Sequence, residues 1–425
     1  MLNNFVPISN TFPTKTSNVS QYTIAASNKI SENIKTNIIK KLNTYPVLSH
    51  TNRIFNFIPL KTIYGESVKW NGNYIVLVDT QTLAVSLSTT DKETAYENRK
   101  MQTALCFLYS KDGLNWNFGS YFYVYNNNNS SDLKGQWSGN LVMREGTQNQ
   151  FDLFYTHYEQ YLSGTVTEQN TKNIVHISGS FNSDLSLDMN SPSTIISPDD
   201  LNYATWWMNK NNIFQDPYVF VNPYDGYIYC LFSGSVALGN GTIQMKDQYR
   251  GILNPGVVES NTSNKTGVIG LSRFSGDSFN TGTWTNLSPI LSLCGVSSEA
   301  MNPILIFKDS YTYLLFGLNS DTSNVVTGLY GFYSENGIFG DFVPLNSDGL
   351  VLSNTSEAPD QIFNFIVDDD LNVYSIIRDS YSFTPAPTTK IILDRENAYV
   401  GTQSNYGYVP PKRDWSDIYV NSNPY

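Results

Sequence analysis

The sequence predicts an all-β protein: a five-bladed β-propeller preceded by a short N-terminal arm that is helical or irregular. The first observation is composition. Aromatic residues make up 14% of the 425 residues, alongside 28 Gly and 18 Pro, which is typical of many short strands joined by tight turns. The second is a pattern that recurs five times, in which an apolar segment, a polar turn and an aromatic strand follow one another.

Each recurring unit has the form of a β-hairpin. A lone hairpin is only marginally stable, so sheets arranged around an axis would bury the surfaces that single hairpins leave open. Further strand candidates at 105–110 and 328–333 would widen the sheets. The five units, which predict five blades, occupy residues 59–78, 138–155, 216–232, 302–316 and, more faintly, 361–377.

The ends of the chain differ from this repeating part. Residues 1–48 form the predicted arm, and Ile30, Ile34 and Ile38 have the spacing of a helix packed on the propeller. The propeller itself is expected over residues 49–400. Residues 401–425 are aromatic and broken by proline, which indicates a tail packed on the outside.

Charge and hydropathy limit the partners. The net charge is −11 and no basic cluster is interleaved with aromatics, so neither nucleic acid nor an anionic membrane is an expected partner. No apolar stretch is long enough to span a bilayer, and the N-terminus has no signal-peptide pattern, which predicts a cytoplasmic protein. Charged residues are only 15%, below the usual ~25%, and such a surface favours association with copies of the chain.

Metal-binding residues do not cluster in the sequence. The cysteines Cys106, Cys230 and Cys294 lack a paired metal spacing, and the three histidines are scattered. We therefore expect no metal and no cofactor. Buried thiols are the favoured state of the cysteines, and one disulfide with one free thiol is the alternative.

Four segments carry a resemblance to a known family: 53–60, 135–139, 211–219 and 297–303. They include the elements Trp-Ser-Gly, Asp-Pro and Glu-x-x-x-Pro in the family's order, and over residues 50–400 the chain resembles the levansucrases and inulosucrases. These are bacterial, sucrose-cleaving fructosyltransferases of glycoside hydrolase family 68. The resemblance implies a five-bladed propeller, in agreement with the repeat pattern.

The resemblance also implies ligand-binding residues. Trp137 and Ser138 correspond to residues that line the fructosyl subsite, and Asp216 to the aspartate that holds sugar hydroxyls and stabilises the transition state. Glu299 corresponds to a substrate-binding glutamate. Gln215 stands where the family has arginine, so a positive charge and a rigid fork of donors are missing there.

Two positions depart from the family's catalytic residues. Asn56 stands where the family has its nucleophilic aspartate, and Met301 where it has the general acid. Retaining glycosyl transfer needs two carboxyl groups about 5 Å apart, and a thioether has no proton to give. The sequence therefore predicts no catalytic residues. Asn56, Asp216 and Met301 mark the positions of a catalytic site that has become degenerate.

Three functions stay open. The main hypothesis is a catalytically inactive propeller that acts as a structural, self-assembling protein, such as an intracellular inclusion released on lysis, a crystal or an accessory component. The first alternative is a non-catalytic carbohydrate-binding protein that uses Trp137, Ser138, Gln215, Asp216 and Glu299. The second is a residual sucrose-cleaving fructosyltransferase, in which Glu299 and Asp216 would have to replace the missing carboxyl groups.

Overall fold

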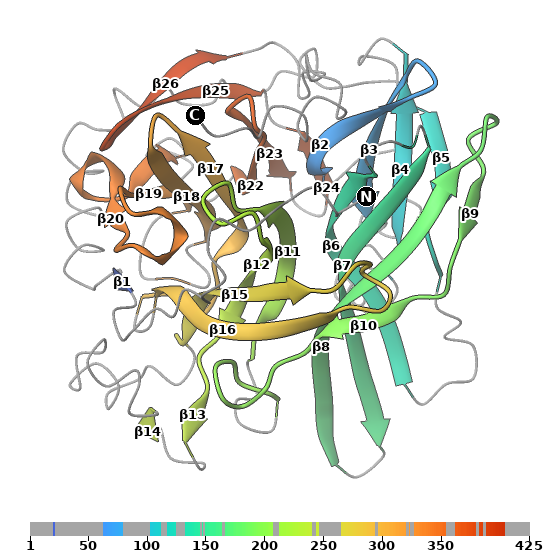
Figure 1. Ribbon diagram of the computed structural model, residues 1–425, viewed down its shortest axis with the longest axis horizontal. Helices are drawn as coiled ribbons and strands as arrows, with labels where there is room; N and C mark the ends of the chain where they lie inside the picture. Colours follow the sequence, from blue (N-terminus) through green and yellow to red (C-terminus); the bar gives the residue numbers. More distant parts are fainter. Residues whose placement is uncertain are drawn as a thin grey trace.

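In the computed structural model of the protein, five antiparallel sheets make up most of the described chain (Figure 1). Two 3-10 turns, η4 (Gly337–Phe339) and η5 (Leu345–Ser347), are the helical segments within the described residues. The structure describes residues 20–21, 63–79, 103–111, 117–124, 132–144, 147, 149–163, 166–206, 212–239, 244–245, 265–293, 296–319, 323, 327–353, 362–379, 382–385 and 388–403.

We name the five sheets blades 1 to 5 in chain order, with the strands of each blade ordered from the first strand outward. Blade 1 contains β2 (Ile63–Trp70), β3 (Asn73–Asp79), β4 (Leu105–Ser110) and β5 (Asn117–Tyr121). Blade 2 contains β6 (Asp132–Met143), β7 (Gln150–Ser163), β8 (Val166–Phe181) and β10 (Ser193–Ile196), with β9 (Leu187–Met189) also paired to β8. Blade 3 contains β11 (Phe214–Val221), β12 (Ile228–Ser235), β15 (Gly267–Ser275) and β16 (Thr283–Ser292).

The last two blades follow the same plan. Blade 4 contains β17 (Met301–Lys308), β18 (Tyr311–Leu318) and β19 (Gly328–Ser334), with β20 (Val343–Pro344) and β21 (Leu350–Ser353) both paired to β19. Blade 5 contains β22 (Ile362–Val367), β23 (Asn372–Asp379), β25 (Thr389–Asp394) and β26 (Asn397–Gln403), with β24 (Ser382–Pro385) paired to β23. Two short strands, β13 (Leu238–Gly239) and β14 (Gln244–Met245), pair with each other.

The first strands of the blades close into a ring. Contacts run from β2 to β6, β6 to β11, β11 to β17, β17 to β22, and from β22 back to β2. This closure defines a five-bladed propeller, so the predicted fold class is confirmed. All five predicted hairpins are present as the first two strands of a blade, and the Asn71-Gly72 turn of the first has φ of 48° and 73°, as a tight hairpin turn requires.

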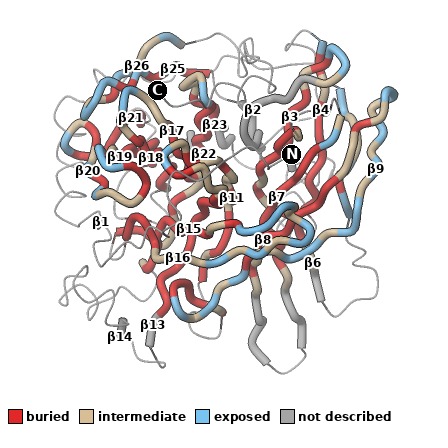
Figure 2. The backbone as a smooth tube through the Cα atoms, in the orientation of Figure 1, coloured by how far each residue is buried: buried red, intermediate tan, exposed pale blue. Residues whose placement is uncertain are grey.

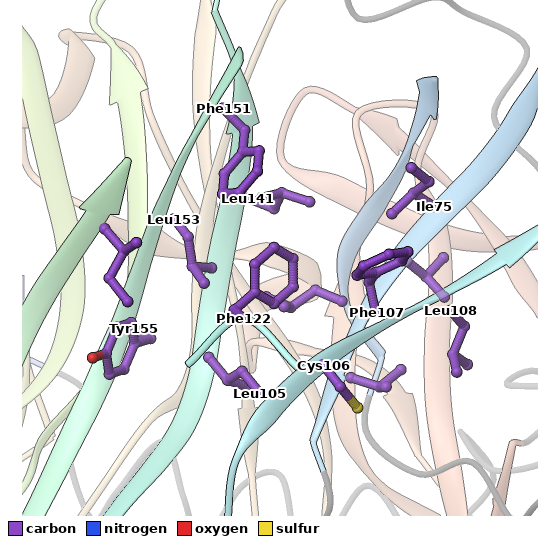
Figure 3. Close-up of a cluster of buried hydrophobic side chains, with 14 of the residues drawn as sticks. Ile75, Leu105, Cys106, Phe107, Leu108, Phe122, Leu141, Phe151, Leu153 and Tyr155 are labelled. Atoms are coloured by element: carbon purple, nitrogen blue, oxygen red, sulfur yellow. The ribbon is translucent and has the colours of Figure 1, made fainter. Parts of the chain in front are cut away.

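Aromatic side chains fill the space between blades 1 and 2. The ring of Phe107 in β4 faces the ring of Phe122 (Figure 3), with the centroids 5.8 Å apart. The Phe107 centroid lies 5.3 Å from that of Phe181 in β8. Phe122 lies 5.5 Å from Phe151 of β7 with the rings nearly perpendicular. Each fully buried ring contributes roughly 1.5–3 kcal/mol through burial, which explains why an aromatic-rich sequence suits this fold. Figure 2 shows buried residues along strands such as β3 and β4, whereas β9 has only exposed and intermediate residues.

The ends of the chain lie mostly outside the described residues. The predicted helix in the arm and the tail beyond residue 403 are therefore not described. One piece of the arm is described: β1 (Ser20–Gln21) pairs in parallel with β16 at the outer edge of blade 3. Cys106 and Cys230 are buried free thiols as predicted, and Cys294 lies outside the described residues. Within the described chain, no helix has the length and apolar character needed to cross a membrane.

Candidate functional site

Four of the first strands contain a β-bulge at a residue other than glycine with positive φ. These residues are Ser138 in β6 (φ 25°), Asp216 in β11 (60°), Asn302 in β17 (46°) and Asn364 in β22 (57°). We call them the bulge ring. Such a backbone conformation costs roughly 1–3 kcal/mol per residue and is concentrated at functional sites. The bulge ring is therefore the first place to look for function.

The local sequence explains two of the bulges. Asp216 and Asn302 are each followed by proline, which has no N–H for the strand ladder. The strand register shifts at both places, between Gln215 and Tyr218 and between Met301 and Ile304. Asp and Asn tolerate positive φ better than most residues, which makes them suited to the residue before each proline.

Hydrogen bonds join the bulge ring in series. The Asn302 backbone N–H donates to Asp216 Oδ2 at 3.1 Å, and the Asn302 Nδ2 donates to Asn364 Oδ1 at 2.6 Å. The Ser138 hydroxyl hydrogen-bonds to the Asp216 carboxyl group. Side chains and backbone at the bulges therefore connect blades 2, 3, 4 and 5 at one level of the propeller.

Thr156 of β7 orders the donors around Asp216. Its Oγ1 accepts the Asp216 backbone N–H at 3.0 Å and lies 3.0 Å from Ser138 Oγ. When Thr156 donates its own hydrogen to Ser138, the Ser138 hydrogen is available for the Asp216 carboxylate. This order satisfies each of the three groups.

The Asp216 carboxyl group is electrostatically perturbed. The residue keeps some exposure to solvent, but protein atoms surround its carboxyl group on most sides. Burial raises the pKa of Asp216, and the hydrogen bonds from Ser138 and the Asn302 N–H, together with the nearby charge of Lys172, offset part of that rise. A carboxyl group with a raised pKa at a strained position is a candidate functional group.

Trp137 lies with Tyr158 and Lys172 on one face of blade 2. Its ring stacks on Tyr158 with centroids 4.9 Å apart and an interplanar angle of 11°, and Lys172 Nζ lies 5.3 Å from the Trp137 ring centroid. The register explains this grouping, because Trp137 pairs with Thr156, Tyr158 pairs with Lys172, and residues two apart share a face.

Gln215 links a cation to an anion. Lys172 Nζ donates to Gln215 Oε1 at 3.0 Å, and Gln215 Nε2 donates to Glu299 Oε2 at 3.3 Å. The structure thus brings together all five residues predicted to bind a ligand. Lys172 contacts both Trp137 and Gln215, and Gln215 donates to Glu299. Ser138 is the partner of Asp216. Two carboxyl groups, an ammonium and an aromatic face are groups that can hold a polyhydroxylated ligand.

Of the two substituted catalytic positions, the described residues include Met301 but not Asn56. Met301 begins β17 opposite Gly317, and a Cβ on Gly317 would lie 3.5 Å from both the Cβ and the Cε of Met301, so the methionine side chain packs over that glycine. Asn56 lies outside the described residues. The geometry of the predicted trio is therefore known only for Asp216 and Met301.

The sequence analysis missed Lys172, Thr156 and Asn364. Asn364 had a signal, because it interrupts the apolar strand Phe363-Asn364-Phe365 at the position that the bulges occupy in other blades. Thr156 and Lys172 had no such signal in the sequence. Thr156 belongs to β7 and Lys172 to β8, and their position near Asp216 depends on how blade 2 packs on blade 3. Among the described residues, no group of three or more His, Cys, Asp or Glu is arranged to hold a metal ion.

The closed five-bladed propeller holds the carboxyl group of Asp216 on a first strand and that of Glu299 just before another, an arrangement that belongs to a class of carbohydrate-active proteins. The chain belongs to the glycoside hydrolase 68 family, Levansucrase/Invertase, which it matches over residues 12–410. It is 28% identical over 390 residues to a levansucrase of Zymomonas mobilis subsp. mobilis, covering 87% of each chain. It is 27% identical over 417 residues to an extracellular sucrase of the same organism, covering 94% of this chain and 97% of that one.

Solved structures support the fold. A levansucrase from Gluconacetobacter diazotrophicus superposes with a TM-score of 0.75 at 17% identity, over 96% of both chains. The β-fructofuranosidase catalytic domain of Microbacterium saccharophilum K-1 gives 0.72 at 18% identity, over 96% of this chain and 97% of that one.

The main functional hypothesis, an inactive structural propeller that assembles with itself, is wrong. Relatives named levansucrase and extracellular sucrase match almost the whole chain, which favours the sucrose-cleaving alternative. The hypothesis inferred an inactive site from the substitutions at two motif positions, Asn56 and Met301. Motif positions do not determine where carboxyl groups lie in space, and the site retains two of them, Asp216 and Glu299, in one connected cluster.

Proposed function

We propose that this protein cleaves sucrose and transfers the fructosyl unit to water or to a carbohydrate acceptor. The observation that carries the proposal is the Asp216 carboxyl group, held at a strained bulge by Ser138 and by the Asn302 N–H. A carboxylate fixed by donors from two neighbouring strands, β6 and β17, changes position little during a reaction. Such a preorganised negative charge stabilises the positive charge that develops on a fructosyl ring.

The second carboxyl group of the proposed site is Glu299. Gln215 donates to its Oε2, which fixes the carboxyl group relative to blade 3. In the proposed reaction Glu299 donates a proton to the glycosidic oxygen as its bond to the fructosyl carbon breaks, while Asp216 faces the fructosyl ring. The oxygen of water or of the acceptor hydroxyl then bonds to that carbon, and its proton returns to Glu299. The protonation of the leaving group contributes typically about 10²–10⁴-fold to such a step.

The test is the release of glucose from sucrose by the purified chain, with released fructose measured in parallel. Glucose reports total cleavage, and the excess of glucose over fructose reports transfer to an acceptor. We expect Asp216→Asn and Glu299→Gln each to reduce the rate at least a hundredfold, on the order of the loss of one electrostatic or acid group. Asp184→Asn is the matched control, because Asp184 is exposed and bonds only within its own turn to Ser186. A rate that is the same in the chain and in Asp216→Asn would refute the proposal.

A second candidate function is binding of a fructose-containing sugar without cleavage. Met301 favours it, since a thioether stands where the family has its acid and packs over Gly317. Trp137 supplies an aromatic face and Gln215, Asp216 and Glu299 supply polar groups. Calorimetry with sucrose, fructose and levan distinguishes the two: heat that is lost in Trp137→Ala, without release of glucose, selects binding, whereas cleavage selects the enzyme.

Self-association and a cytoplasmic location stay predictions from composition and sequence. Sedimentation velocity at several protein concentrations measures the first. Fractionation of the cells that make the protein measures the second, and recovery from the medium would contradict it.

A further inference from the structure

We infer that Lys172 is a positioning residue of the site, a cation that acts together with Gln215 in place of the arginine that the family motif has before its aspartate. The ammonium comes from β8, and the amide that it holds comes from β11 in the next blade. The inference rests on the proposed function for its activity measurement only, since its first test needs no substrate.

The geometry makes Lys172 an organised group. Only 9% of Lys172 is exposed, its Nζ lies 3.0 Å from Gln215 Oε1, and the same Nζ lies 5.3 Å from the Trp137 ring centroid. A buried ammonium is costly unless hydrogen bonds and charges compensate it. The amide dipole, the aromatic face and the nearby carboxyl groups provide that compensation.

Lys172 also decides which way the Gln215 amide points. An ammonium group can only donate, so the amide oxygen must face Lys172. The amide nitrogen then faces Glu299 and donates to its Oε2 at 3.3 Å. The positive charge of Lys172 is in this way linked through Gln215 to the Glu299 carboxyl group.

Other charged side chains of blade 2 pair with one another, whereas the charge of Lys172 acts on Asp216. Lys134 of β6 and Glu159 of β7 pair with each other at 2.8 Å, and His157 lies 3.8 Å from Glu159, so these charges balance within blade 2. Glu299 precedes β17, while Asn302 and Asn364 bring neutral amides from blades 4 and 5. Lys172 is placed to favour the ionised form of Asp216, and its charge holds the pKa of Asp216 below the value that burial alone would give.

The first experiment measures the Asp216 carboxyl group directly. The chain is labelled with ¹³C at aspartate carboxyl carbons, and Asp216→Asn assigns the signal. We expect Lys172→Met to raise the titration midpoint of Asp216, Lys172→Arg to keep it near the original, and the control Lys134→Met to leave it unchanged. If Lys172→Met does not fold, Lys172→Gln gives the same comparison. An unchanged midpoint in the neutral variant overturns the inference.

The second experiment moves the charge. Gln215→Arg in the Lys172→Met background places a cation at the family's position, whereas Gln215→Arg alone puts two cations side by side. We expect kcat/KM for sucrose to fall roughly 10–100-fold in Lys172→Met, as for loss of a hydrogen-bonded charge, and to recover at least partly in the double variant. Single and double variants that behave additively would overturn the inference.

The two experiments separate failure of the inference from failure of the proposed function. If the original chain releases no glucose from sucrose but the Asp216 midpoint moves in Lys172→Met, the function fails and the role of Lys172 stands. If glucose is released and neither the midpoint nor kcat/KM responds to Lys172→Met, the function stands and the inference fails.

Discussion

The backbone N–H of Asn302 donates to Oδ2 of Asp216 at 3.1 Å across the boundary between blades 4 and 3. The donor is main chain, so the identity of the side chain at position 302 does not decide whether this bond forms. Pro303 and the positive φ of Asn302 set the direction of the N–H. The bond is therefore compatible with other side chains at position 302.

Asp216→Asn is expected to stabilise the protein while it removes activity. Burial raises the folded-state pKa of Asp216, so the carboxyl group favours folding below its unfolded pKa and that contribution is lost as pH rises through the folded pKa. At pH 7 the asparagine, which needs no charge, should raise the free energy of unfolding, because burial disfavours the carboxylate and does not penalise a neutral amide in the same way. Urea unfolding of both proteins at pH 4 and pH 7 measures it. The gain should shrink at the lower pH, and a loss of stability at pH 7 would contradict the expectation.

The hydrogen bond between Asn302 and Asn364 should be separable from the backbone strain at Asn364. In Asn364→Ala the 2.6 Å bond disappears and the φ of 57° has to be adopted by alanine, which costs about 1–2 kcal/mol for the strain and about 1 kcal/mol for the bond. Asn364→Gly removes the bond but tolerates the φ.

We therefore expect Asn364→Gly to be the more stable of the two variants, measured by thermal or urea unfolding. Glucose release should fall in both, because Asn302, which holds Asp216, loses a partner in both. Equal stability of the glycine and alanine variants would show that the positive φ at this position carries no strain.

Asp152 should make the stability of blade 2 dependent on pH. Arg144 donates to both of its carboxyl oxygens at 2.7 Å, and His176 Nε2 lies 2.6 Å from Oδ1. Burial alone would raise the pKa of Asp152, but the hydrogen bonds and charges of Arg144 and His176 outweigh burial and lower it.

A lowered folded-state pKa contributes stability above the unfolded value and loses it as pH falls through the folded one. Asp152→Asn should therefore cost about 3 kcal/mol at pH 7, as for one partner removed from a buried ion pair, and less at pH below about 4. Urea unfolding across this pH range measures the effect, with the exposed Asp188→Asn on β9 as control. A cost that is the same at pH 3 and pH 7 would exclude the ionised carboxylate as its source.

The sequence was sufficient for the five hairpins because a hairpin is coded locally. Alternation of apolar residues and turns such as Asn71-Gly72 act within about ten residues of each other. The motif residues Trp137 and Asp216 could be found in the same way, by local resemblance. For the bulge ring, the sequence contained local signals at the two residues before proline and at Asn364. That the four bulges form one hydrogen-bonded ring could not be predicted, because a register shift in one strand is defined by its partner strand.

Lys172 is a clearer case of the same limit. Its partner Gln215 is 43 residues away, in another blade, and no spacing in the sequence relates the two. The motif positions therefore indicate the missing arginine but not the cation that lies nearby. The substituted positions alone favoured a structural protein, and this prediction was wrong because they carry no information about the charges assembled around Asp216.

Restoring the family's residues at Asn56 and Met301 should accelerate sucrose cleavage. Met301→Glu adds a proton donor at the start of β17, and Asn56→Asp adds a carboxylate that can attack the fructosyl carbon. Residues of one catalytic unit act non-additively, so each single variant should change the rate little. We expect the double variant to gain at least about 100-fold in kcat/KM, the lower end of what acid catalysis contributes. Initial rates of glucose release measure all four proteins, and Met301→Gln with Asn56→Asp is the matched control, because it has the size of the glutamate without its proton. Equal rates in the double variant and this control would show that the acid at work lies elsewhere, and Glu299→Gln in the double variant then tests whether it is Glu299.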